Sequence, residues 1–162
     1  MNPGDPIFIF PFEKQIDEIQ ERILILSTET FLKSWQSHGN PLKAQALIEK
    51  KQFLCVFVDE AQALASGCSK DKLYHFVENW MKTENLKPAL ANQFFIEVQK
   101  EIRTFNRSEI LLALEKNEIS MDSALFPSWL STRDEFTKLW GQPLSMFRKI
   151  LRLQEKESNF SR

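Results

Sequence analysis

The chain has 162 residues, a length that fits one domain with one hydrophobic core. Its 21 Lys and Arg residues nearly balance its 22 Asp and Glu residues, so no overall positive field attracts nucleic acid or an anionic membrane. Two cysteines, no secretory signal pattern and no apolar segment of bilayer length predict a cytoplasmic protein with reduced thiols and no membrane span.

The first third of the chain predicts a strand, a long helix and an antiparallel pair of strands. The apolar, β-prone run 7–12 is typical of a strand. Across residues 13–37, apolar residues recur at steps of three and four, which predicts one long helix or two consecutive ones. Residues 43–58 alternate and then become continuously apolar, which favours two strands joined by a turn near Lys50 and Lys51, the second strand being central.

The rest of the chain predicts alternating helices and extended segments. In order, we expect a helix at 69–81, a strand at 94–102, a short helix at 107–116, an extended piece at 123–130 and a helix at 134–140. Asn106 or Ser108 could cap the helix at 107–116, and Ser131 or Thr132 could cap the helix at 134–140. The tail 148–162 is predicted to dock as an amphipathic helix or to fray. Together these segments predict a single α+β domain over residues 1–162, with a mostly antiparallel central sheet covered by helices.

Most of the unusual residue chemistry lies between Trp35 and His75. This stretch contains the pattern W-x-x-H-G-x-P-L-x-A from Trp35, then F-L-x-x-x-V-D-E from Phe53, then A-S-G-C-S-x-D from Ala65. The pattern resembles a family of short, mostly Bacteroidetes proteins of unassigned function, whose members are often labelled ABC-transporter ATPases. A nucleotide site of that type needs a glycine-rich loop ending in Gly-Lys-Ser or Gly-Lys-Thr. None of the four scattered glycines precedes a lysine, so we expect no P-loop ATPase activity.

The segment from Asp59 to Asp71 is predicted to connect the buried strand to a helix. Free backbone amides and the positive end of the helix dipole favour an anion at such a place. The predicted ligand-binding residues are Gly39, Ser66, Gly67, Ser69, Asp71 and His75. Ordinary structural roles are the competing interpretation, with Ser69 as the N-cap, Gly67 as a turn residue and Asp71 as a first-turn acid. The sequence thus predicts a module that binds a small anionic ligand or a protein partner.

A cysteine-dependent enzyme or thiol-redox protein using Cys68 is the alternative function. The helix dipole and neighbouring lysines would favour the thiolate form of this residue. His75 lies about 10 Å along the helix axis from Cys68, which is too far for direct proton transfer. His38, expected at the end of the preceding helix, would then be the base, and Asp59 or Glu60 would orient it.

No motif in the sequence predicts a metal or a cofactor. Two cysteines and two histidines occur at irregular spacing, without a Cys-x-x-Cys or His-Glu-x-x-His pattern. Cys55 is flanked by Leu54 and Val56 in an apolar strand, and we expect it to be a small buried hydrophobe. Binding and cysteine chemistry therefore stay the two open functions, and both centre on residues 38–75.

Overall fold

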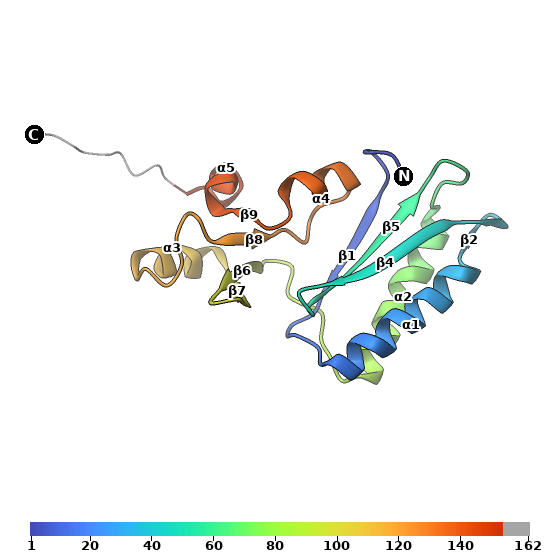
Figure 1. Ribbon diagram of the computed structural model, residues 1–162, viewed down its shortest axis with the longest axis horizontal. Helices are drawn as coiled ribbons and strands as arrows, with labels where there is room; N and C mark the ends of the chain where they lie inside the picture. Colours follow the sequence, from blue (N-terminus) through green and yellow to red (C-terminus); the bar gives the residue numbers. More distant parts are fainter. Residues whose placement is uncertain (154–162) are drawn as a thin grey trace, which may run out of the picture. The chain divides into compact units, whose positions relative to one another are not determined.

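The computed structural model describes residues 1–153, and Figure 1 labels their helices and strands. These residues form helices and antiparallel sheets, so the predicted α+β fold is confirmed. Within this range the strands belong to three antiparallel sheets. The chain divides into two compact units, Met1–Ala91 with Pro127–Trp140 (unit 1) and Asn92–Phe126 with Gly141–Arg162 (unit 2). The expectation of one domain over the whole chain stays a prediction.

Unit 1 is built on a three-stranded sheet with the order β1-β5-β4. Its strands are β1 (Ile7–Pro11), β4 (Lys43–Glu49) and β5 (Phe53–Asp59), and both pairings are antiparallel. Every residue of β5 is buried, because β5 has a neighbour on each edge and layers on both faces. The predicted turn between β4 and β5 is present, and Lys50 and Lys51 have positive φ angles of 53° and 54° there. The prediction of a central second strand is confirmed.

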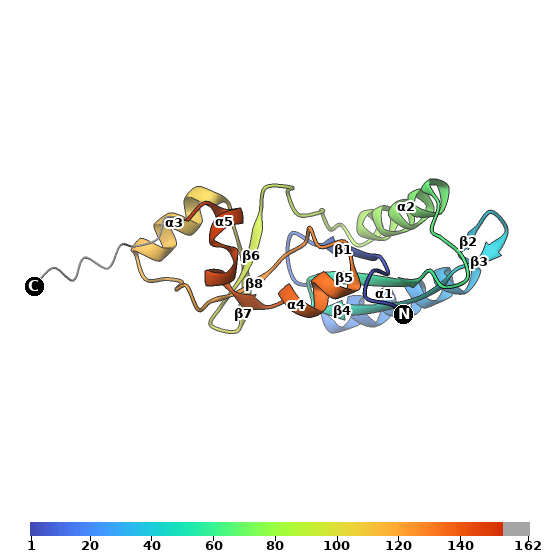
Figure 2. The ribbon, with the colours of Figure 1, turned by 90° about the horizontal axis from the view of Figure 1, so that it is seen from above.

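Helices α1 (Glu18–Ser34) and α2 (Gly67–Thr83) cover one face of this sheet, as Figures 1 and 2 show. A capping box between Asp17 and Gln20 starts α1, since each side chain bonds the backbone N–H of the other. The helices and the even-numbered residues of β5 share one apolar core, which includes Leu24, Leu32, Leu54, Val56, Val58, Leu73 and Val77. The apolar residues that recur every three or four positions in the helices therefore pack against those that recur every second position in the strand.

Helix α4 (Arg133–Leu139) packs on the other face of the sheet. Phe136 makes an edge contact with Phe57, with ring centroids 5.2 Å apart, and Trp140 does the same with Phe53 at 4.9 Å. Because Phe53 and Phe57 are odd-numbered residues of β5, they point away from α1 and α2. Thr132 caps α4 through its side chain, which decides between the two predicted caps. Unit 1 is therefore a three-layer arrangement of helix, sheet and two helices.

Unit 2 consists of a four-stranded antiparallel sheet with short helices. Its elements are β6 (Phe94–Val98), β7 (Glu101–Phe105), α3 (Arg107–Glu115), β8 (Ala124–Phe126), β9 (Gln142–Pro143), the 3-10 helix η1 (Leu144–Phe147) and α5 (Arg148–Leu151). Asn106 caps α3, as one of the two alternatives predicted. The single strand predicted at 94–102 is wrong, because the chain reverses at Gln99 and Lys100, whose φ angles are 52° and 69°. Glutamine and lysine are not the usual residues of a two-residue hairpin turn, so the sequence gives little indication of the turn.

The predicted tail 148–162 lies only partly within the described residues. Arg148–Leu151 forms α5, and the side chain of Leu151 is buried in unit 2. Residues 154–162 are outside the part that the structure describes. Among residues 1–153 no helix has both the length and the apolar character needed to cross a bilayer.

Candidate functional site

His38 and Gly39 form the tip of a small hairpin in unit 1. Helix α1 ends at Ser34, and the hairpin strands β2 (Gln36–Ser37) and β3 (Asn40–Pro41) follow. His38 and Gly39 have φ angles of 51° and 81°, as a two-residue hairpin turn with both central residues left-handed requires. The prediction that His38 lies at the helix end is therefore wrong. Its side chain is exposed at the hairpin tip instead.

Two hydrogen bonds hold this hairpin against the start of α2. The indole Nε1 of Trp35 donates to the backbone carbonyl of Ser69 at 2.8 Å, in a buried position. The backbone N–H of Ser66 donates to the Oγ of Ser37 at 3.3 Å. Figure 2 shows the hairpin beside the first turn of α2. The structure thus brings the hairpin that carries His38 next to the helix start that carries Cys68.

Ser66, not Ser69, caps helix α2. The Oγ of Ser66 accepts from the backbone N–H of Ser69 at 3.3 Å, and the buried Ser69 hydroxyl donates back to the Ser66 carbonyl at 2.8 Å. The predicted N-cap was wrong by three residues, because either serine fits the local pattern and only the backbone conformation decides. Since the Ser69 amide is already bonded, it has no free N–H for an anion. Within residues 1–153 the amides of Gly67 and Cys68 have no such partner.

The remaining predicted residues of α2 are exposed. Cys68 is exposed at the second position of the helix, whose first turn contains no acidic residue. Because α2 starts at Gly67, Asp71 lies beyond that turn, and its predicted role as a first-turn acid is wrong. His75 is also exposed, with its Nδ1 3.6 Å from the Oε2 of Glu78. Gly67 has no positive φ, and an added Cβ would meet no atom within 4 Å, so no turn requires a glycine there.

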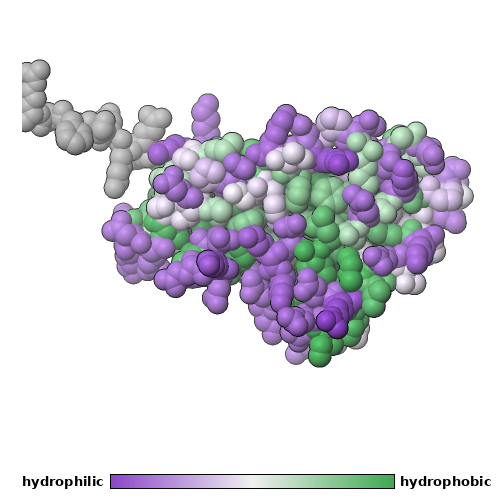
Figure 3. Space-filling model, viewed as in Figure 1, coloured by the Kyte–Doolittle hydropathy of each residue, from purple (hydrophilic) through white to green (hydrophobic). Residues whose placement is uncertain are grey.

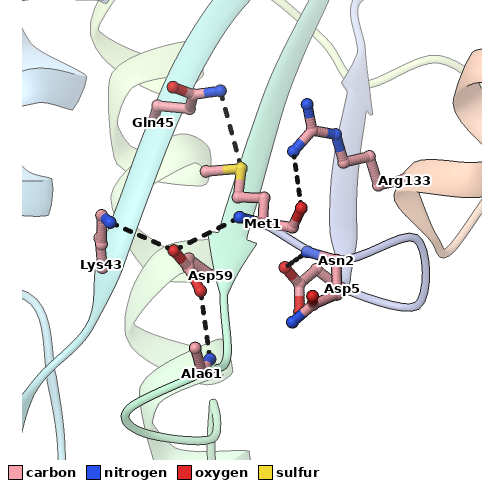
Figure 4. A network of polar contacts seen from close by, with 8 residues as sticks. All are labelled: Met1, Asn2, Asp5, Lys43, Gln45, Asp59, Ala61 and Arg133. Carbon is pink, nitrogen blue, oxygen red and sulfur yellow. Dashed lines mark hydrogen bonds and ion pairs between the residues drawn. The ribbon is translucent and has the colours of Figure 1, made fainter.

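Asp59 ends β5 in a network of polar contacts that Figure 4 shows from close by. Its Oδ1 accepts from the backbone N–H of Ala61 at 3.1 Å. Its Oδ2 lies 3.3 Å from the Nζ of Lys43 and 3.6 Å from the amino group of Met1. The Ala61 hydrogen bond, and then Lys43, lower the pKa of this carboxyl group. The side chain is buried, and its charge stabilises the strand end.

Glu60 closes the loop that follows. Its Oε1 accepts from the backbone N–H of Ala65 at 2.9 Å, which draws the two ends of the loop together. Asp59 and Glu60 therefore bond the loop and the sheet, and within residues 1–153 neither has a hydrogen bond or ion pair with His38. The arrangement of Cys68, His38 and an orienting acid stays a prediction, and the structure gives both candidate acids other partners.

Cys55 is buried at the centre of β5, as predicted. Its burial away from water, with a smaller effect of Glu49, raises the pKa of the thiol far above its usual value. This thiol is therefore neutral and inert at physiological pH. Among the described residues, no three His, Cys, Asp or Glu side chains lie together in a way that could hold a metal ion.

Unit 2 contains a cleft of about 680 Å³ that the sequence analysis did not predict. One wall is a single face of α3, made of Arg107, Leu111, Leu114 and Glu115. The other wall comes from the loop after α3, from α5 and from the residues after it, namely Met121, Arg148, Arg152 and Leu153. Except for Met121, the second wall comes from residues more than thirty positions after α3 in the chain. The spacing on α3 and the basic tail were the available signals, but nothing in the sequence shows that they meet.

The cleft combines apolar walls with cationic side chains. Arg107 donates from Nε to the Leu151 carbonyl at 2.9 Å and from Nη2 to the Arg152 carbonyl at 3.3 Å, which fixes α3 against the end of α5. Arg148 and Arg152 have no ion pair within the described part of the chain. Three arginines therefore face the cleft with only Glu115 as a lining acid.

Comparison with family models, curated proteins and solved structures found no match to the chain. The expected family resemblance of residues 35–71 stays a prediction.

Proposed function

We propose that the protein is a cytoplasmic binding module, and that the cleft of unit 2 holds a small ligand with an apolar body and an oxyanion head. The observation that carries this proposal is an open cleft with both apolar walls and unneutralised arginines. Its volume of about 680 Å³ is within the range of roughly 300–1,000 Å³ that small-molecule sites occupy.

The apolar walls support binding of a hydrocarbon or aromatic body. Leu111 is 43% exposed, although it lies on a helix face that turns toward the rest of unit 2. Leu114 and Met121 are half-buried beside it. A ligand body that covers these side chains removes apolar surface from water, which stabilises the complex by about 25 cal/mol per Å² of surface covered.

The arginines support an anionic head. A guanidinium group donates two parallel hydrogen bonds to a carboxylate or phosphate, which a lysine cannot do. Arg107 is held by two carbonyl groups, so its orientation is fixed before any ligand arrives. Arg148 is half-buried, and partial burial strengthens an ion pair by reducing the screening by water.

The anion site predicted at 59–71 has weaker support. Ser69 contributes no free amide, and Asp71 and His75 lie farther along α2 on its exposed side. At the start of α2, the amides of Gly67 and Cys68 have no hydrogen bond among the described residues. Ligand binding thus stays the preferred function, at a different place in the fold.

The test is calorimetric titration of the full chain with four ten-carbon probes, each below its solubility limit and below any micelle-forming concentration. The probes are decanoate, decyl phosphate, decanol and decyltrimethylammonium. We expect the two anions to bind at least about tenfold more tightly than decanol, since a charge-assisted hydrogen bond contributes about 1.5–3 kcal/mol. The two anionic probes also distinguish a carboxylate from a phosphate ligand.

A matched pair of variants locates the site. Arg148→Gln should remove most of the preference for decanoate over decanol, because Arg148 lines the cleft. Lys149→Gln removes the same charge from the next residue, which is exposed and outside the cleft, and should leave the preference unchanged. Equal binding of decanol and decanoate by the unmodified protein, or equal effects of the two variants, would overturn the proposal.

Thiol chemistry at Cys68 is a second candidate function, favoured by the bonds that place the His38 hairpin beside the exposed cysteine. If His38 acts as a base, the His38→Ala variant should show slower iodoacetamide alkylation of Cys68, with a changed pH profile between about pH 5 and 10. His75→Ala is the control, because His75 lies two turns along α2. Identical profiles for the three proteins would exclude a base role for His38.

A further inference from the structure

Helix α1 carries a row of apolar side chains that the fold does not bury. Ile19, Ile23 and Leu26 are 71%, 44% and 62% exposed, and they follow one another at steps of four and three. This spacing is that of a coiled-coil seam. Leu24 and Leu32 already supply the helix with a buried core face on another side. In Figure 3 green side chains reach the lower edge of the molecule, where Figure 1 places the start of α1 and the end of α2.

Two opposite charges flank this apolar seam on the same side. Arg22 precedes Ile23, and Glu29 precedes Thr30, which is the next position of the seam. Both are exposed, and neither has an ion pair within residues 1–153. They are two turns apart, so one flanking position of the seam is basic and the next one on that side is acidic.

We propose that a second copy of this chain packs on the seam in antiparallel orientation, related by a twofold axis. In that orientation the flanking positions of the two helices face each other, so Arg22 lies opposite Glu29 of the second copy, and the reverse pair forms by symmetry. A parallel arrangement would place Arg22 and Glu29 opposite Ser27 and Ser34 of the second copy and form no ion pair. The charges therefore select both the partner and the orientation.

The seam fits a weak, concentration-dependent dimer. Three apolar side chains from each copy cover less than the roughly 800 Å² per partner of a standard stable interface. Rim ion pairs contribute little affinity but choose between orientations. This inference rests on unit 1 alone and is independent of the cleft in unit 2.

Sedimentation equilibrium of the full chain, from about 10 μM to 1 mM, tests this interface. Arg22→Glu and Glu29→Arg should each weaken dimerisation about tenfold, because either change replaces two attractive pairs with two repulsive ones. The double variant restores opposite charges across the axis and should recover the affinity of the unmodified protein. Single variants without effect, or a double variant no better than the singles, would overturn the proposal.

A change in the seam itself gives a second test. Ile23→Lys should make the protein monomeric while circular dichroism stays that of the folded chain, because this side chain is not part of the core. Leu64→Lys is the control, since Leu64 is 70% exposed and lies outside α1. If the chain is monomeric at all concentrations, the proposal is overturned, and the seam would instead be a contact surface for a membrane or another protein.

Discussion

The start of α2 and the cleft of unit 2 differ in how they use their polar groups. At the start of α2, the chemically unusual residues of the sequence bond one another: Trp35 to Ser69, Ser37 to Ser66, and Glu60 to Ala65. In the cleft, common residues leave two arginines without an ion pair among the described residues. Unusual residues in one stretch can therefore be a requirement of the fold, while a binding site can come from ordinary residues. The following predictions test whether the two regions are separable in this way.

The largest effect should come from Trp35. Trp35→Ala removes a fully buried ring and leaves the Ser69 carbonyl without its donor, so we expect a loss of about 3–5 kcal/mol in the free energy of unfolding. Trp35→Phe keeps most of the volume and loses the N–H, and should cost about 1–3 kcal/mol. Urea unfolding measures both. Decanoate binding by folded Trp35→Phe should be unchanged, and weaker binding would couple the two regions.

Asp59 should make stability depend on acid pH. Its pKa is lower in the folded chain than the value of about 3.9 in an unfolded one. The stabilisation is therefore complete above that value and is lost as the pH falls through the folded pKa. Asp59→Asn should be less stable at pH 7 and should lose less further stability on acidification.

Thermal unfolding at pH 7 and pH 3 measures the two effects. Asp71→Asn is the control, because this exposed acid has no hydrogen bond or ion pair in the described part of the chain. An Asp59→Asn variant as acid-sensitive as the unmodified protein would contradict the role of the network in Figure 4.

The cap of α2 should have a smaller effect. Ser66→Ala removes the acceptor of the Ser69 amide and should cost about 1 kcal/mol in urea unfolding. Ser66→Asp keeps an acceptor beside the positive end of the helix and should cost much less. Equal losses from the two substitutions would show that the cap is not the reason for this serine.

Cys68 should have the smallest effect on stability. Cys68→Ser changes an exposed side chain with no described contact, so the free energy of unfolding should change by less than about 0.5 kcal/mol. In the folded protein, iodoacetamide should modify Cys68 and leave the buried Cys55 unmodified. A large loss of stability would give Cys68 a structural role and weaken the thiol hypothesis.

Local patterns predicted most of unit 1 and less of unit 2. The apolar run at 53–59 identified the central strand, because a strand covered on both faces has no polar alternation. The caps at Asn106 and Thr132 were among the alternatives, because a capping box needs only residues three apart. Turn positions such as His38 and Gln99 were missed, since left-handed conformations at these residues come from strand pairing and not from their own preference.

The candidate site was predictable only where it depends on neighbours in sequence. Ser66 and Ser69 were correctly placed at a helix start, although Ser66 and not the predicted Ser69 is the N-cap. The ion-pair partners of Asp59 and the contact of Arg107 with Leu151 depend on residues sixteen or more positions away. Contacts over such separations depend on the fold of the whole chain, so they cannot be predicted from residue spacing alone.

The order of the units along the chain has a consequence for biosynthesis. Unit 1 takes α4 from residues made after most of unit 2, and α4 supplies the rings that cover Phe53 and Phe57. A ribosome adding about 5–20 residues per second needs roughly 2 to 10 seconds to extend the chain from Ala91 to Trp140. During that interval one apolar face of the sheet lacks its cover, and a nascent chain is most in need of chaperone protection. A fragment ending at Ala91 would keep that exposed face permanently.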